Sequence, residues 1–132
     1  MTKRALIIGG SSGIGKATAQ HLLNQGCEVH VVGTNATKLE TFQQETIGNL
    51  HTHQVDITDT AQVGMLNQVI SGWDHLEYLV NASGIFGPKP FLEHTVADYD
   101  SYQDLNRGFF FITQAAAKKM SESQGGAIVN VG

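Results

Sequence analysis

The sequence predicts an α/β fold in which helices cover both faces of a doubly wound parallel sheet of five strands. Short apolar runs alternate along the chain with longer stretches of helical periodicity, in the repeating order strand, helix, strand. The first run, 5–8, is apolar throughout, as expected for a strand that is covered on both faces. Such a repetition implies parallel pairing with right-handed crossovers.

Each element follows from a local pattern. The apolar residues of 13–25 line one broad face of a helix, and Gly26 marks the end of that helix. A loop with Pro88 and Pro90 precedes the longest helix, in which we expect a break near Gly108. The remaining predicted strands are 28–33, 50–57, 76–84 with its exit turn, and 126–132, and the remaining helices are 37–46, 60–70 and 98–120.

Length and composition indicate one globular domain, because 41% of the 132 residues are hydrophobic and 15% are charged. The net charge of −4 argues against nucleic acid as a partner. Cys27 is the only cysteine, so no internal disulfide can form, which is typical of a reducing compartment. The apolar runs are too short for a bilayer span or a signal peptide, and we therefore expect no membrane partner and a cytoplasmic location.

A glycine-rich segment, GGSSGIGKAT, follows the first strand and opens the first helix. Gly10, Gly15 and Lys16 have the spacing of a P-loop, which would bind a nucleoside triphosphate. A P-loop needs a hydroxyl where this chain has Ala17, and Thr18 lies about 100° further around the helix. The segment also fits a dinucleotide-binding turn, since N–H groups at a helix start can bind a pyrophosphate. A tight turn without any ligand is the structural alternative.

Gly9, Gly13 and Gly15 form the pattern G-x-x-x-G-x-G, and with it the chain resembles the short-chain dehydrogenase/reductase family. Ile8 stands where that family usually has Thr. VDITD resembles the segment whose Asp, here Asp56, contacts the adenine ring, although Asp56 could also cap a turn. The other matching segments are LVNASG, which keeps Asn81 and Gly84 of an Asn-Asn-Ala-Gly turn but departs at Ala82 and Ser83, the helix DLNRGFFFITQAAAKKM and the strand GGAIVNV.

The resemblance implies a Rossmann-type NAD(P)-binding domain over 1–132 that is incomplete at its C-terminus. It assigns thirteen residues to the cofactor: Gly9, Ser11, Ser12, Gly13, Ile14, Gly15, Thr34, Asn35, Asp56, Ile57, Asn81, Ala82 and Gly84. NAD-binding members usually carry an acid at the end of the second strand, where this chain has Gly33-Thr34-Asn35. The basic residue typical of NADP binders is also missing, but Thr34, Asn35, Thr37 and Lys38 could serve. We therefore expect NADP, with NAD possible.

The family's chemistry is hydride transfer between the nicotinamide and a small carbonyl or alcohol substrate. It implies a catalytic Ser just past the fifth strand and a later Tyr-x-x-x-Lys pair, so we expect the 132 residues to lack all three and to be inactive alone. Asn106 is the remaining catalytic candidate. DYDSYQDLN places Asn106 at the family's Asn, whereas RGFFFITQ places it one residue out of register, which turns a helical side chain by about 100°.

Two further expectations concern partners and metals. The fifth strand would form an exposed apolar edge, and so we expect a homo-oligomer, or else a non-catalytic NAD(P)-binding or interaction module that pairs with another chain. His51 and His53 alternate on one strand, but two histidines without a third ligand make a poor zinc site. The other histidines suggest no constellation, and we predict no metal.

Overall fold

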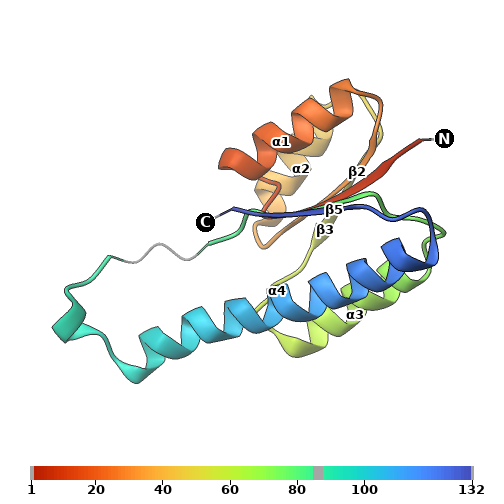
Figure 1. Ribbon diagram of the computed structural model, residues 1–132. Coiled ribbons are helices and arrows are strands. Elements are labelled where there is room, and N and C mark those ends of the chain that lie inside the picture. Colours follow the sequence, from red (N-terminus) through yellow and green to blue (C-terminus); the bar gives the residue numbers. More distant parts are fainter. Residues whose placement is uncertain (1, 85–87, 132) are drawn as a thin grey trace.

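The computed structural model describes residues 2–84 and 88–131. Its five parallel strands form one sheet in the order β3-β2-β1-β4-β5, and helices cover both faces of this sheet (Figure 1), which confirms the predicted doubly wound α/β fold. The strands are β1 (Arg4–Ile8), β2 (Glu28–Gly33), β3 (Leu50–Gln54), β4 (Tyr78–Asn81) and β5 (Ala127–Asn130). The helices are α1 (Gly13–Asn24), α2 (Ala36–Glu45), α3 (Thr60–Ser71) and α4 (Val96–Glu122), with a short 3-10 helix at Phe91–Glu93 that the sequence did not predict.

The two faces of the sheet build two separate cores. Side chains alternate along β1, so that Ala5 and Ile7 pack under α1 and α2, while Leu6 and Ile8 pack under α3 and α4. All four are fully buried. The continuous apolar run of β1 therefore serves both layers, as expected for a strand covered on each side.

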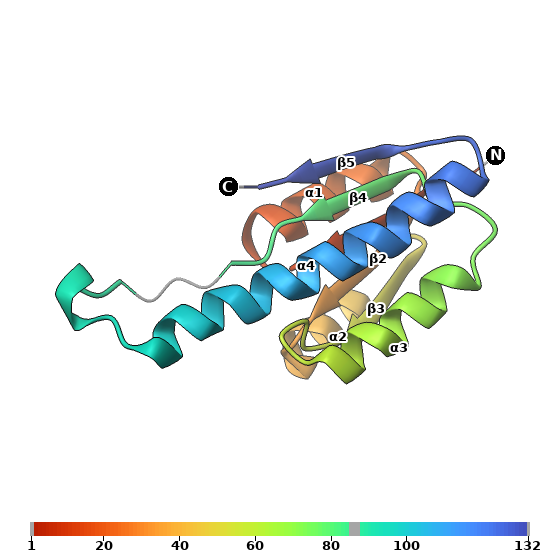
Figure 2. The ribbon, with the colours of Figure 1, turned by 60° about the horizontal axis from the view of Figure 1, so that its bottom comes forward.

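The longest helix, α4, runs without interruption, and the predicted break near Gly108 is wrong. Gly108 is instead the point at which α4 approaches the segment after β3. A Cβ atom on Gly108 would lie 2.1 Å from the carbonyl oxygen of Ile57, so only glycine fits at this crossing. Figure 2 shows the N-terminal half of α4 extending beyond the C-terminal edge of the sheet.

Local signals account for the helix starts. Thr95 and Asp98 form a reciprocal capping box at the start of α4, Asn35 caps α2 and Asp59 caps α3. The third strand ends at Gln54 rather than at the predicted residue 57. At the other edge of the sheet β5 is exposed along its whole length, in line with the expected apolar edge.

Candidate nucleotide-binding site

A cleft of about 540 Å³ opens at the carboxyl ends of β1 to β4. Its walls come from the β1–α1 turn, the end of β2, the segment after β3 and the turn after β4. β1 pairs with β2 on one side and with β4 on the other, so the strands that follow β1 are added first toward one edge of the sheet and then toward the other. Ligands of open α/β sheets bind at such a switch point, outside the carboxyl ends of the strands.

The β1–α1 turn depends on glycine at two positions in different ways. Gly9 adopts a φ of +82°, and its N–H group donates to the carbonyl of Val32 at 2.8 Å, which ties the turn to β2. Gly15 lies under the turn, where an added Cβ would be 2.1 Å from the carbonyl oxygen of Gly9. The start of α1 therefore lies against the turn at a distance that only glycine permits.

The start of α1 supplies backbone donors to the cleft. Ser12 is the N-cap residue in an extended conformation, and Ser12, Gly13 and Ile14 all line the cleft. The first N–H groups of a helix have no carbonyl partner within it, and they carry the positive end of the helix dipole. This arrangement can bind an anionic group such as a pyrophosphate.

The far wall of the cleft carries polar but uncharged groups at the end of β2 and one carboxylate after β3. Thr34 is exposed and lines the cleft. Asp56 is half-buried, and its Oδ1 accepts hydrogen bonds from the backbone N–H and the hydroxyl of Thr58, at 3.0 and 2.6 Å. Asp56 thus stabilises the turn after β3, the structural role that the sequence also allowed for it, and it borders the cleft as well.

The structure brings ten of the thirteen proposed cofactor residues to this cleft. Gly15 supports the turn from below, and Asn35 caps α2 by accepting a 3.0 Å hydrogen bond from the backbone N–H of Lys38. Asn81 is buried and donates to the side chains of Asn130 and Thr113, at 2.7 and 3.2 Å. These three residues shape the elements around the cleft rather than line it, and the cofactor contacts of all thirteen stay a prediction.

Asn106 does not line the cleft. It borders a neighbouring hollow together with Asn81 and Asn130, while Leu105 lines the cleft in its place. The two registers indicated by DYDSYQDLN and by RGFFFITQ both stay predictions. Ser83 and Thr58 also line the cleft, and sequence reasoning missed both as site residues. The catalytic role of Asn106 stays a prediction.

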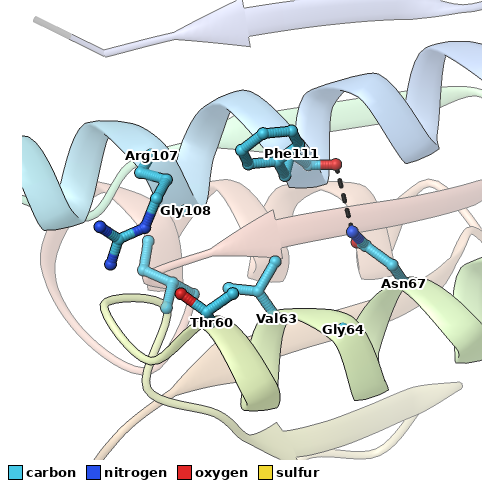
Figure 3. Close-up of a pocket in the computed structure, with 8 residues that line it drawn as sticks. Thr60, Val63, Gly64, Asn67, Arg107, Gly108 and Phe111 are labelled. Carbon is cyan, nitrogen blue, oxygen red and sulfur yellow. Dashed lines mark hydrogen bonds between the residues drawn. The ribbon is translucent and has the colours of Figure 1, made fainter.

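A second, apolar cavity of about 230 Å³ lies between α3 and α4 and was not predicted (Figure 3). Gly64 and Gly108 line it from the two helices, and an added Cβ on Gly64 would meet no atom within 4 Å. The side-chain Nδ2 of Asn67 donates to the carbonyl of Phe111 at 3.2 Å across the cavity. Ile57 is the one residue that this cavity shares with the nucleotide cleft among their described linings.

Comparisons of the sequence with known proteins identify its family. The model of the short chain dehydrogenase family matches residues 3–132. D-threitol dehydrogenase of Mycolicibacterium smegmatis is 34% identical over 98% of this chain and 52% of its own length. An NADP-dependent 3-hydroxy acid dehydrogenase of Escherichia coli is 28% identical over 96% of this chain and 52% of its own length.

Comparison with solved structures also finds short-chain dehydrogenases/reductases. A short-chain type dehydrogenase/reductase from Mycobacterium marinum superposes with a TM-score of 0.85 at 32% identity, over 97% of this chain and 54% of that one. The chain thus spans about half the length of the relatives it matches. In the described residues no helix is both long and apolar enough to cross a membrane. The chain belongs to the short-chain dehydrogenase/reductase family.

Proposed function

We propose that this chain is the nucleotide-binding part of an NAD(P)-dependent short-chain oxidoreductase, and that it prefers NADP(H). One observation carries the proposal: a single cleft joins the N–H donors at the start of α1 to an uncharged polar wall at the end of β2. The first feature suits a pyrophosphate. The second suits a ribose phosphate, because it brings no carboxylate against that group.

The glycines of the cleft provide a test of fit. An added Cβ on Gly9 would lie 2.6 Å from the hydroxyl oxygen of Ser83, and one on Gly33 would lie 2.8 Å from that of Ser11. Gly9 and Gly33 therefore lie directly against the serine side chains of the neighbouring turns, and a larger residue at either position would push these turns apart. A dinucleotide site needs glycine where the turn packs this closely beside the strand ends.

Each part of the cleft has a proposed role. The N–H groups at Gly13 and Ile14 bind the pyrophosphate, and Thr34 faces the adenosine ribose. Asp56 and Ile57 border the adenine, and the turn at Ala82 and Gly84 leads toward the nicotinamide. When bound, the cofactor supplies or accepts the hydride that interconverts a small carbonyl compound and its alcohol.

The preference for NADP(H) rests on charge. Thr34 and Asn35 are neutral where a carboxylate would select the ribose hydroxyls of NAD. The start of α2 directly follows, and its helix dipole favours a phosphate at this end. The Escherichia coli relative, which is named as NADP-dependent, agrees with this preference.

The test is a thermal-shift and calorimetric titration of the purified protein with NADPH, NADH and ATP. We expect NADPH to bind at least several-fold tighter than NADH. A protein stabilised by ATP alone would instead have a triphosphate site, and equal affinities for NADPH and NADH would refute the preference.

The variant Thr34→Asp sharpens the test. The repulsion between a carboxylate and a ribose phosphate about 4–5 Å apart weakens binding by about 1 kcal/mol in water and by up to about 4 kcal/mol at a protein surface, where the dielectric constant is lower. We therefore expect NADPH affinity to fall at least about tenfold, with NADH affinity kept or raised. Thr41→Asp adds the same charge at an exposed position of α2 away from the cleft, and it should change neither affinity.

A further inference from the structure

A cluster of histidines lies on the neighbouring strands β2 and β3, before the residues of these strands that line the nucleotide cleft. The parallel register sets His30 opposite His51, and His53 lies two residues further along β3 on the same face. The ring of His30 stacks 4.5 Å from that of His51 and 5.1 Å from that of His53, measured between centroids. Two neighbouring strands thus bring three imidazoles together.

Glu28 completes the cluster from the start of β2. Its Oε2 accepts a hydrogen bond from the Nε2 of His30 at 2.9 Å. Arg4 also donates to this carboxylate and holds it in place. Burial alone would raise the pKa of Glu28, but the hydrogen bonds from Arg4 and His30 outweigh it and bring the pKa to about 2.

The donor atoms of Glu28, His30 and His51 lie within 4.8 Å of one another. Zinc bonds of about 2.0–2.1 Å in a tetrahedral site place neighbouring donors about 3.3 Å apart. The Oε2 of Glu28 and the Nε2 of His30 are 2.9 Å apart, so they need to separate by only about 0.4 Å to reach that spacing. His51 is exposed, and its Nε2 hydrogen-bonds to Asn49, so its ring can turn toward the pair at the cost of a surface contact.

His53 can orient the buried ring of His30. The Nδ1 of His30 lies 2.8 Å from the Nε2 of His53, and the side chain of His30 is 8% exposed. Metal-binding histidines commonly donate their second N–H to a neighbouring acceptor, and the Nε2 of His53 can serve as that acceptor for His30.

We propose that Glu28, His30 and His51 form a binding site for a divalent transition-metal ion such as Zn²⁺, with His53 as a positioning residue. Imidazole with one carboxylate is a ligand set that suits Zn²⁺ and its neighbours in the first row. His30 now donates from Nε2 to Glu28. On metal binding the ring proton of His30 moves from Nε2 to Nδ1, and that of His53 moves in the same way. The Nδ1–H of His30 then donates to the Nε2 of His53, and the rings of His30 and His53 stay neutral.

Arg4 does not oppose a cation at this site as a free charge would. Its guanidinium is shared between Glu28 and Asp74, the latter at 3.2 Å, and it also donates to the carbonyl of His75 at 2.9 Å. The two carboxylates outnumber the guanidinium by one negative charge. A divalent ion therefore meets a region that is net negative before binding.

The sole tryptophan of the sequence, Trp73, offers a direct readout. Its ring centroid lies 4.5 Å from that of His30. Co²⁺ bound at the cluster should quench the Trp73 fluorescence and show visible absorption typical of a tetrahedral site. Zn²⁺ is titrated by calorimetry on the same protein to give the affinity and the stoichiometry.

His51→Ala is the decisive variant, because His51 is exposed and its loss should leave the fold intact by circular dichroism. We expect one Zn²⁺ per chain in the unchanged protein and at least about tenfold weaker binding in His51→Ala. His53→Asn should weaken binding less than His51→Ala does. His94→Ala removes an exposed histidine from outside the cluster and should leave the affinity unchanged.

Glu28→Gln provides a second variant that keeps the side-chain shape while removing the charge, and it too should weaken Zn²⁺ binding. The proposal is overturned if the unchanged protein shows no saturable binding of Zn²⁺. It is equally overturned if His51→Ala binds Zn²⁺ as tightly as the unchanged protein, or if His94→Ala abolishes the binding.

Discussion

Replacing Gly15 by alanine tests whether the β1–α1 turn is held together by close backbone packing. The new Cβ would lie 2.1 Å from the oxygen and 2.8 Å from the carbon of the Gly9 carbonyl, and 3.1 Å from the Cα of Gly10. All three are backbone atoms, which cannot rotate away. An ordinary contact needs about 3.4 Å, so the start of α1 must move away from the turn by about 1.3 Å.

Two energies oppose each other in this variant. Alanine is favoured over glycine inside a helix by about 1 kcal/mol. Forcing an extra carbon into a filled space costs about 1–3 kcal/mol, and more where backbone must shift. We therefore expect Gly15→Ala to lower the free energy of unfolding by about 1–3 kcal/mol, and the melting temperature by about 3–5 °C for each kcal/mol.

Gly64→Ala is the matched control, since it makes the same change inside α3, where an added Cβ meets no atom within 4 Å. This variant should gain about 1 kcal/mol of stability from helix propensity alone. Chemical denaturation measures both changes. NADPH titration should show at least about tenfold weaker binding for Gly15→Ala, because the N–H donors move, and no change for Gly64→Ala. Equal stability and equal affinity in the two variants would refute the packing argument.

Three other outcomes are expected. Gly108→Ala should destabilise the protein by about 1–3 kcal/mol in chemical denaturation, because its Cβ would lie 2.1 Å from the carbonyl oxygen of Ile57. Asn81→Ala should cost about 0.5–1.5 kcal/mol by the same measurement, since it removes the hydrogen bond that the buried side chain of Asn81 donates to Asn130 at 2.7 Å. Hydrogen bonds from the backbone N–H of Thr95 and then from Lys89 lower the pKa of Asp98 to about 2 from 3.8, so its capping contribution is present above pH 3.8 and is lost as the pH falls toward 2. Hydrogen exchange at the start of α4 should show that loss in the unchanged protein, whereas Asp98→Asn should remove this pH dependence.

The parts of the fold that the sequence predicted are those set by local chemistry. The apolar run 5–8 gave β1, and the glycines after it gave the turn, because both signals lie within a few neighbouring residues. The cap at Asn35 and the capping box of Thr95 and Asp98 define helix starts in the same local way. Ten of the proposed cofactor residues meet at one cleft for the same reason, since each one follows a strand end.

The parts that the sequence could not predict depend on contacts between distant residues. Gly108 looked like a helix breaker, because a glycine inside a helix costs about 1 kcal/mol relative to alanine. Glycine is required at position 108 because α4 packs there against the carbonyl of Ile57, which lies 51 residues earlier in the chain. A contact between residues so far apart leaves no signal in the sequence around Gly108.

The histidine cluster on β2 and β3 also depends on a contact between distant residues that the sequence could not predict. Sequence reasoning rejected a metal at His51 and His53 because it found no third ligand, and the pairing register of two strands places His30 directly opposite His51. The same two strands lead into the nucleotide cleft, where Thr34 follows His30 by four residues, or about 13 Å of extended chain. At that separation from Thr34 we expect no direct contact between a metal at Glu28, His30 and His51 and a ribose phosphate at Thr34. His51→Ala should therefore weaken Zn²⁺ binding while leaving NADPH affinity unchanged, and Thr34→Asp should do the reverse, so that the two proposals stand or fall independently.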